Sequence, residues 1–308
     1  MTFPVKRALI AALLTATALP ATAQSLPRGF YLRGTVQAEY LFDAHPDRNF
    51  FSGDLAMGIL PEEAPWSLPI GVDIGLKGFR SNRGDLSESV LYGAVGFWTE
   101  MGTFWAGAPR PATSGYFTLP RIGGSQAFGA FAGTAVTSTD TIALFGESAG
   151  TVGLRYDYAV DDVKVALSYH DFTDSSVDTF AGLVAYDNGP FVVAVGAEHV
   201  SAPGVNDTDF SARLVYDVED WGFSLLWSST SLVESKTFAA DAFYAVRPDV
   251  RLTASYARFD VEEKSRVYGV AAEYIFPNNA FVGVGVTESD LPELDAGYNA
   301  FLGFKLDY

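Results

Sequence analysis

In several stretches of this chain, charged side chains are an even number of positions apart. Asp73 and Lys77 are four residues apart, and Arg155 and Asp157 are two residues apart, with only uncharged residues between them. Residues two apart in an extended strand point to the same face, so these charges share a face opposite the apolar residues. Such a face in contact with water can order solvent and sort ions by sign. The polar face, which a closed sheet would turn inward, carries the following charged residues: Arg33, Glu39, Asp54, Asp73, Lys77, Arg155, Asp157, Lys164, Arg213, Asp241, Arg251, Glu273 and Lys305.

A structural alternative applies to each of these residues, which could instead belong to an ionic network with no part in selectivity.

The composition excludes several classes of chemistry. The 308 residues include no Cys and only 3 His, with 37 acidic and 20 basic side chains and a formal charge of −17. The chain therefore lacks a thiol nucleophile and a disulfide scaffold. Its acidity argues against nucleic acid as a partner, since phosphate binding needs a basic surface.

The histidines offer one candidate for acid–base catalysis. His170 beside Asp171, with His199 nearby in the strand order, could form a dyad near the rim of a sheet. No serine lies in a nucleophile elbow, and no phosphate-binding loop occurs. We therefore expect no enzymatic activity, and a barrel enzyme remains the less favoured alternative.

Two acidic clusters could attract hard cations. They comprise Asp171, Asp174 and Asp178, and then Glu288, Asp290, Glu293 and Asp295. Oxygen ligands suit Ca²⁺ or Mg²⁺, but no spacing matches an EF-hand. We expect no cofactor and no fixed metal site. Loosely bound Ca²⁺ or Mg²⁺ at these loops, bridging them to lipid phosphates, is the form of metal binding that the clusters favour.

The elements that would position these residues are strands. Apolar and polar residues alternate in sixteen segments, although fourteen strands remain possible because the fourth, fifth and eighth segments are less regular. The segments start near residues 29, 50, 69, 89, 103, 150, 162, 179, 190, 208, 221, 236, 249, 265, 279 and 297.

The N-terminus carries a different signal. Lys6 and Arg7 precede an apolar run over 8–19, and small residues occupy Ala21 and Ala23. This pattern predicts a secretory signal peptide over 1–23, leaving 24–308 as one exported domain. No later apolar run is long enough for a membrane-spanning helix.

The connections between segments are short and long in alternation. Turn-forming sequences such as Asp161–Asp162 alternate with longer acidic connections such as 201–207, 260–265 and 288–296. Short turns at one end and long loops at the other are typical of a transmembrane antiparallel β-barrel. An exported β-sandwich would also alternate, but the loop order and the absence of a helix pattern favour the barrel.

One connection, 111–149, is much longer than the others and follows the fifth strand. A barrel of sixteen strands encloses an aqueous channel unless something fills it. We expect this segment to fold into the lumen as a constriction loop, with Arg121, Asp140 and Glu147 as its charged residues.

The whole chain resembles the sixteen-stranded general diffusion porins of Gram-negative bacteria, in particular those of alphaproteobacteria. The resemblance rests on the alternating last strand ending at Tyr308, on 100–107 leading into the long loop and on 153–157 leaving it. It implies a location in the outer membrane, a homotrimer, contact with lipid and lipopolysaccharide, and recognition of the last strand by the barrel-insertion machinery. The loop holds fewer carboxylates than is usual in such porins.

The resemblance implies passive diffusion of small hydrophilic solutes and ions. Because most of the excess negative charge falls in the loops, we expect weak cation selectivity. The alternative within the same architecture is a substrate-selective channel, which fixed ion pairs or an aromatic track at the constriction would indicate.

Overall fold

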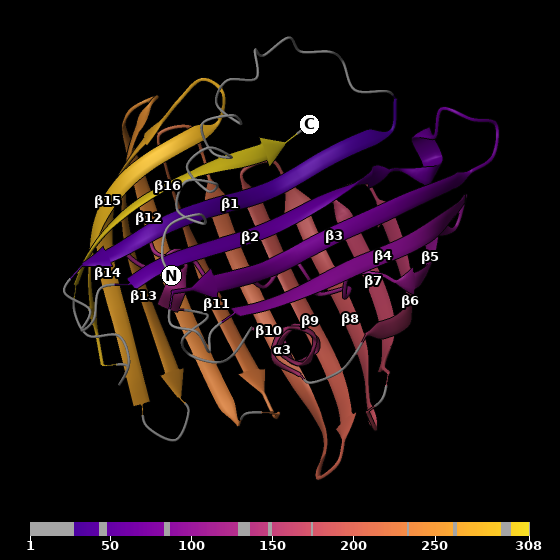
Figure 1. The fold of residues 1–308 in the computed structure, drawn as a ribbon. Coiled ribbons are helices and arrows are strands. Elements are labelled where there is room, and N and C mark those ends of the chain that lie inside the picture. The colour runs from indigo at the N-terminus through magenta and orange to yellow at the C-terminus, as the bar shows by residue number, and fades with distance from the viewer. Residues whose placement is uncertain are drawn as a thin grey trace, which may run out of the picture.

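The protein is a closed antiparallel β-barrel in the computed structural model (Figure 1). Sixteen strands follow one another around the barrel in sequence order, and β1 pairs with β16 to close it. The structure describes residues 28–42, 48–82, 87–128, 136–146, 150–173, 175–232, 234–260, 264–290 and 297–307.

The strands and helices of the described residues have the following bounds: β1 Phe30–Phe42, β2 Arg48–Ile59, η1 Pro61–Glu63, β3 Ile70–Ser81, β4 Ser87–Thr99, β5 Gly102–Ala108, α3 Ser138–Phe145, β6 Thr151–Val160, β7 Val163–Phe172, β8 Val177–Asn188, β9 Phe191–Ala202, β10 Val205–Asp217, β11 Trp221–Thr230, β12 Ser235–Arg247, β13 Val250–Asp260, β14 Lys264–Ile275, β15 Ala280–Ser289 and β16 Gly297–Asp307.

These bounds confirm the predicted fold class and the count of sixteen strands, and each predicted start lies within a few residues of an observed one. Closure explains why the alternation extends over the whole chain. Every strand is hydrogen-bonded on both sides, so the sheet has no edge with unpaired backbone groups.

The alternation separates an apolar outer surface from a mixed inner one. Leu91 on β4 points outward and is 69% exposed, whereas its neighbour Tyr92 points into the barrel and is 1% exposed. Exposed outward apolar side chains and buried inward polar side chains are the reverse of a soluble domain.

Two connections differ from the sequence-based expectation. The predicted long loop around 201–207 is a tight turn, because Gly204 adopts a φ of +84° beside Pro203 and the strands pair up to Ala202 and Val205. Conversely, β2 and β3 are joined by a long segment, residues 60–69, which we term the β2–β3 arm. Its prolines cannot donate hydrogen bonds to the sheet, and so they end the strands early.

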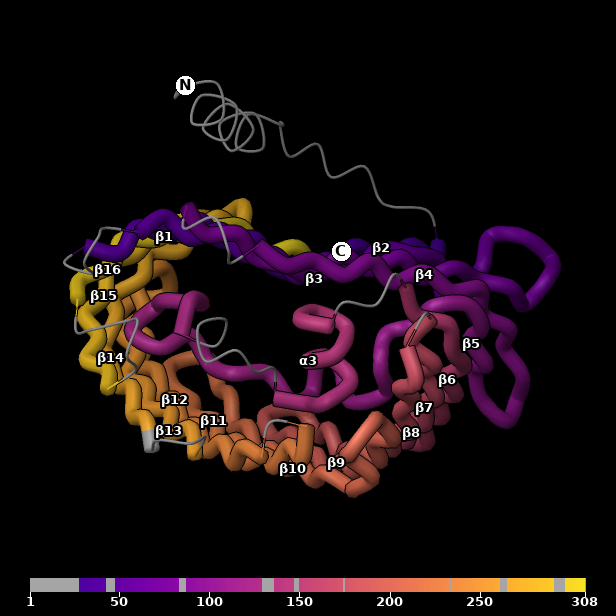
Figure 2. The backbone as a smooth tube through the Cα atoms, turned by 60° about the horizontal axis from the view of Figure 1, so that its bottom comes forward, coloured from indigo at the N-terminus to yellow at the C-terminus, as the bar shows by residue number. Residues whose placement is uncertain are grey.

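The helices are short. α3 begins after Thr137, whose side chain accepts a hydrogen bond from the Asp140 backbone N–H at 3.4 Å. No helix among the described residues is long and apolar enough to cross a membrane. The barrel is flattened in cross-section, and α3 lies inside it between β3 and the β9–β10 wall (Figure 2).

Candidate functional site

The segment after β5 turns into the barrel and first contacts the wall at β7. The Ala112 N–H donates to Ser168 Oγ at 2.9 Å, and His170 Nε2 lies 2.9 Å from the Pro109 carbonyl oxygen. Further along, Phe117 packs against Gly196 of β9, where a Cβ would lie 2.6 Å from the Phe117 ring. The segment thus contacts the wall at inward-facing positions that hold either a polar residue or a glycine.

A second contact lies on the opposite wall, at the turn formed by Gly123 and Gly124. The Gly123 N–H donates to Ser255 Oγ at 2.8 Å, and its carbonyl accepts from Asn299 Nδ2 at 2.9 Å. Gln37 Nε2 donates to the Gly124 carbonyl at 2.8 Å. A Cβ at Gly285 would lie 1.9 Å from the Gly123 carbonyl oxygen, so the absence of a side chain there allows this approach.

Helix α3 makes the third contact. The Glu198 carboxylate of β9 accepts from the Ser138 N–H at 2.7 Å and from the Thr139 N–H at 3.1 Å. The Ser138 hydroxyl donates to Asp209 on β10. A carboxylate at a helix N-terminus satisfies free backbone donors and is favoured by the helix dipole. The opposite side of α3 faces β3 and β4, where Asp140 meets Lys77 at 2.8 Å and the Tyr92 hydroxyl at 3.2 Å.

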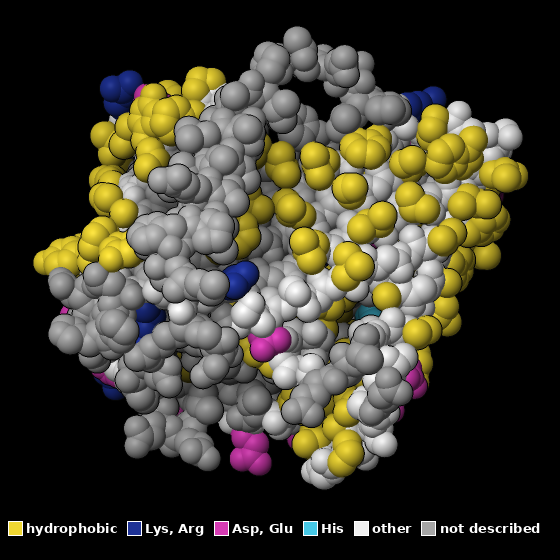
Figure 3. All heavy atoms as spheres, in the orientation of Figure 1, with side chains coloured by type: hydrophobic (Ala, Val, Ile, Leu, Met, Phe, Trp, Pro, Cys, Tyr) yellow, Lys and Arg dark blue, Asp and Glu magenta, His cyan; other side chains and the backbone are white. Residues whose placement is uncertain are grey.

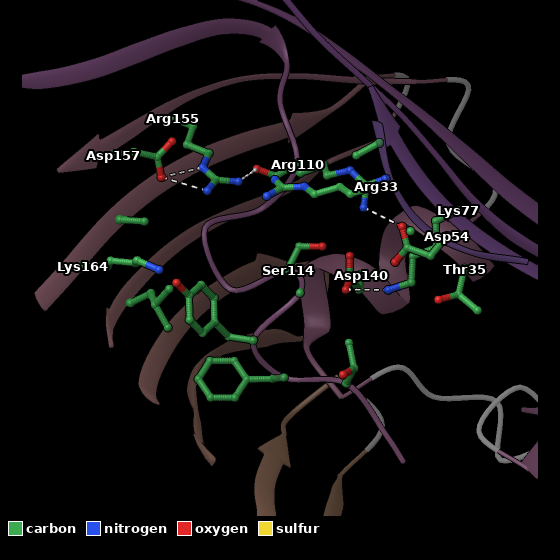
Figure 4. Close-up of a pocket in the computed structure, with 18 of the residues that line it drawn as sticks. Arg33, Thr35, Asp54, Lys77, Arg110, Ser114, Asp140, Arg155, Asp157 and Lys164 are labelled. Carbon is green, nitrogen blue, oxygen red and sulfur yellow. Dashed lines mark hydrogen bonds and ion pairs between the residues drawn. The ribbon is translucent and has the colours of Figure 1, made fainter. Parts of the chain in front are cut away.

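These contacts leave a cavity of about 1190 Å³ inside the barrel, bounded by this segment and by strands that include β1–β3, β6, β7 and β16 (Figure 4). Six basic and six acidic side chains line it: Arg33, Lys77, Arg110, Arg155, Lys164, Lys305, Asp54, Glu62, Glu100, Asp140, Asp157 and Asp307.

Most of these charges are paired. Arg110 Nη1 lies 2.7 Å from Asp54 Oδ1, Arg155 Nη2 lies 2.8 Å from Asp157 Oδ1, and Lys164 Nζ lies 2.8 Å from Asp187 Oδ2. Together with the Lys77–Asp140 pair, these contacts offset positive with negative charge around the cavity. Figure 4 shows the Arg155–Asp157 and Lys77–Asp140 pairs on different sides of the cavity.

Arg110 was not predicted from the sequence, yet it spans the floor of the cavity from the end of β5 to β2. Its guanidinium also donates to the Leu55 carbonyl and stacks over the Tyr92 ring at 5.5 Å. A Cβ at Gly75 would lie 2.4 Å from Arg110 Nε, so this glycine of β3 provides the space. Burial opposes the charge, but Asp54 raises the pKa of Arg110 above its ordinary value.

Asp140 is buried and charged. Burial alone would raise its pKa, but the nearby Lys77 ammonium and the hydrogen bonds from Lys77 and Tyr92 lower the pKa below the ordinary aspartate value. The Asp140 carboxylate therefore stays ionised and holds Lys77 against the segment.

The predicted inward residues fall into two groups. One lines the cavity: Arg33, Asp54, Lys77, Arg155, Asp157, Lys164, Lys305 and, from the loop, Asp140. Asp73 also lies on this side and accepts a hydrogen bond from the Tyr31 hydroxyl.

The other group fixes the loop or the wall. Glu39 accepts from the Gln126 N–H at 3.1 Å, Arg121 Nη1 lies 2.7 Å from Glu273 Oε2, and Arg213 donates to the Tyr116 carbonyl at 2.9 Å.

Two more members of this group hold the wall. Asp241 accepts a hydrogen bond from Ser224, and the Arg251 guanidinium lies 4.0 Å from the centre of the Phe243 ring. Glu147 of the predicted loop lies outside the described residues, as do the predicted signal peptide 1–23, Asp174, Glu293, Asp295 and Tyr308.

Glu198 and Asp209 were missed, although the alternation in β9 and β10 points both side chains inward. The structure does not bring together the dyad considered as the less favoured alternative. His170 is buried inside the barrel, whereas Asp171 and His199 are exposed on its outer face. Among the described residues, no group of three or more His, Cys, Asp or Glu side chains is placed to hold a metal ion.

No protein-family model matches the chain, and no curated protein matches it in sequence. Solved porin structures do match its fold. A mutant of the Rh. blastica porin aligns with a TM-score of 0.62 at 15% identity, covering 91% of this chain and 100% of that one.

A triple mutant of Rhodopseudomonas blastica porin gives 0.58 at 14% identity, with the same coverage. A porin structure refined at 1.8 Å gives 0.56 at 14% identity, over 90% and 100% of the two chains. The chain therefore has the porin fold, built here from sixteen strands.

Proposed function

We propose that this protein is an outer-membrane porin of a Gram-negative bacterium, through which small hydrophilic solutes and ions diffuse passively. The observation that carries this proposal is the charged cavity of about 1190 Å³ inside a closed sixteen-stranded barrel with an apolar outer surface. A barrel of this size leaves an aqueous interior, and diffusion through it needs no cofactor.

We further propose weak cation selectivity. The cavity charges are balanced in number and largely paired, so they favour neither sign strongly. The two rims are acidic, with Asp171 and Glu288 at the long-loop end and Asp161, Asp162 and Asp220 at the short-turn end. Acidic mouths raise the local cation concentration, most strongly at low salt.

The assembly and partners follow from the resemblance to general porins. We propose a homotrimer that contacts outer-membrane lipid and lipopolysaccharide and is inserted through recognition of its last strand. We also propose that Ca²⁺ or Mg²⁺ binds loosely at the acidic loops, because carboxylates such as Asp171 and Glu288 supply the oxygen ligands that these cations prefer.

Planar-bilayer conductance of the purified protein tests the function. We expect stepwise, ohmic channels and a cation-directed reversal potential under a KCl gradient. An anion-directed potential would contradict the proposed selectivity and would assign control to Arg33 and Lys305 in the cavity. Folded barrels that never conduct would contradict the porin proposal itself.

A substrate-selective channel is the second candidate. The fixed pairs Lys77–Asp140 and Arg110–Asp54 at the constriction favour it, because ordered charges can bind one class of solute. Saturable solute flux in liposomes would support this candidate, and flux proportional to concentration would support the general porin.

A further inference from the structure

Two inward-facing aromatic side chains lie side by side on the β15–β16 wall of the barrel. Phe281 and Phe301 are both buried, and their ring centres are 6.3 Å apart with the ring planes tilted by 58°. A Cβ at Gly303 would lie 2.3 Å from the Phe281 ring, and a Cβ at Gly283 would lie 2.3 Å from the Phe301 ring. The absence of a side chain at each glycine therefore gives each ring the space to lie along the wall.

Arg121, from the segment after β5, places its guanidinium over both rings. Its Cζ atom lies 5.0 Å from the centre of the Phe281 ring and 5.6 Å from the centre of the Phe301 ring. Its Nη1 atom lies 2.7 Å from Glu273 Oε2 and donates to Gln37 Oε1 at 3.4 Å. Figure 2 shows this segment reaching the β14–β16 side of the barrel. The two rings and the Glu273 carboxylate, here termed the aromatic platform, thus bind one guanidinium by cation–π attraction and an ion pair.

The Glu273 carboxylate has no second cation beside it. Its side chain is 7% exposed, and a carboxylate sheltered from water to this extent needs a charged or hydrogen-bonding partner. Arg251 lies opposite Glu273 in the strand register, but its guanidinium lies over the Phe243 ring at 4.0 Å. Among the described residues, Arg121 alone forms an ion pair with Glu273. The aromatic platform without Arg121 would therefore carry one uncompensated negative charge.

The segment after β5 is docked on both sides of Arg121 by contacts that do not involve the Arg121 side chain. On one side the Tyr116 carbonyl accepts from Arg213 at 2.9 Å, and on the other the Gly123 N–H donates to Ser255 Oγ at 2.8 Å. The Arg121 side chain is 30% exposed. Rotamer changes of exposed side chains are fast and need no backbone movement, so the guanidinium can leave the aromatic platform while the segment stays docked.

We propose that the aromatic platform is a binding site for small solutes that carry a guanidinium group, and that Arg121 occupies it in their absence. This inference deepens the proposed function and rests on it, since the solute reaches the site through the pore. A solute guanidinium has the planar shape and the charge of the group that it replaces. Figure 3 shows mostly hydrophobic side chains on the outer wall over β3–β5, so that face offers a charged solute few partners.

The tether of Arg121 sets the concentration at which a solute displaces it. A group held on a short flexible link has an effective concentration on the order of 1 mM at its own site. A free guanidinium therefore replaces Arg121 only at comparable concentrations, and it leaves again when Arg121 returns. Passage of guanidinium solutes is thus expected to saturate with concentration, whereas neutral solutes pass without binding.

Planar-bilayer recordings of a variant with an empty aromatic platform test the site. We expect methylguanidinium to reduce the current of Arg121→Ala pores reversibly, with half of the effect at or below about 1 mM. The native protein should need a several-fold higher concentration, because Arg121 competes for the site. Methylurea has the same planar shape without the charge and should leave both currents unchanged. The absence of any block in Arg121→Ala would overturn the proposal.

Two further substitutions and a matched control identify the residues that bind. In the Arg121→Ala background, Glu273→Gln should abolish the block, and Phe281→Leu should weaken it by roughly 2–5-fold, the range for one cation–π contact. Arg213→Ala is the control, because it also removes an arginine that contacts the segment but leaves Arg121 in place. It should respond as the native protein does, and thermal unfolding checks that each variant is folded. Equal block of Arg213→Ala and Arg121→Ala, or a block that neither added substitution changes, would overturn the proposal.

Solute influx into liposomes tests the native protein. Arginine influx should saturate with concentration and be inhibited by methylguanidinium. Citrulline, in which a neutral ureido group replaces the guanidinium, should enter in proportion to its concentration. Proportional influx of both solutes would overturn the binding site and leave the pore intact. Entry of neither solute through folded barrels would instead contradict the proposed function itself.

Discussion

Asp140 of α3 pairs with Lys77 and so joins the segment after β5, here termed the lumen segment, to the β3 wall. Glu198 of β9 binds the same helix from the opposite wall. Its side chain is 3% exposed and that of Lys77 is 19% exposed, so the pair is sheltered but still reaches water. We expect Asp140→Asn to destabilise the barrel by on the order of 2 kcal/mol, below the ~3–5 kcal/mol for breaking a fully buried pair. It should also lower cation selectivity, because it leaves the Lys77 charge uncompensated.

Thermal unfolding and the reversal potential check this expectation. The control is Asp157→Asn, whose partner Arg155 lies two residues away on the same strand and whose side chain is 32% exposed. That pair should contribute less than about 1 kcal/mol. Equal destabilisation by the two variants would contradict the anchoring role of Asp140.

The Asp140 contribution has a defined pH dependence. The pKa of Asp140 is lowered in the folded protein, so its stabilisation is fully present above the ordinary aspartate value of 3.8 and is lost as the pH falls through the lower folded-state pKa. We expect the difference in melting temperature between the native protein and Asp140→Asn to be constant from about pH 8 to about pH 5. It should shrink only in stronger acid. A difference that already shrinks near pH 6 would assign the effect to another group.

At the scale of residues, the sequence predicts toward which face of the sheet a side chain points, but not which residue it contacts. Strand parity points Lys77 and Asp54 to the inner face, and both line the cavity. It cannot show that Arg110, which belongs to no strand, reaches Asp54 across two intervening strands. That contact depends on the path of the loop and on the space above Gly75, neither of which follows from local alternation.

At the scale of elements, inward glycines determine where the lumen segment can dock. Gly285→Ala would place a Cβ 1.9 Å from the Gly123 carbonyl oxygen, a backbone atom held by Asn299. We expect this substitution to displace the turn, lower the melting temperature by the equivalent of about 1–3 kcal/mol and alter single-channel conductance.

Gly93→Ala is the matched control, because a Cβ at this outward position of β4 meets no atom within 4 Å. It should leave both the melting temperature and the conductance unchanged. If Gly285→Ala behaved like Gly93→Ala, the turn would have to be free to move, and docking by glycine would be wrong.

The sequence predicts strands better than it predicts connections. Alternation over ten or more residues gives a strong signal, as in β1 and β10. Helix α3 has only eight residues and is stabilised by Glu198, which lies on a different strand, so no local pattern reveals it. The β2–β3 arm was missed because its prolines resemble ordinary turn residues until the strands around them are known.

At the scale of the whole molecule, charge is distributed by position. Paired charges occupy the cavity and acidic residues occupy the rims. The outer wall carries apolar and aromatic residues instead. This arrangement lets the constriction keep its shape through local contacts while the rims set the long-range field. Length and alternation predicted the barrel because a closed sheet is the only strand architecture that satisfies every backbone group in lipid.

Pairing of β1 with β16 has a consequence for how the chain can be rearranged. Arg33 lies opposite Asp307, so the first and last strands of the described barrel begin and end at the same rim. A short linker could join them there, and the chain could be opened at the tight turn between β9 and β10 instead. Every strand would keep both neighbours in such a circular permutant, which makes the order of synthesis separable from the final topology.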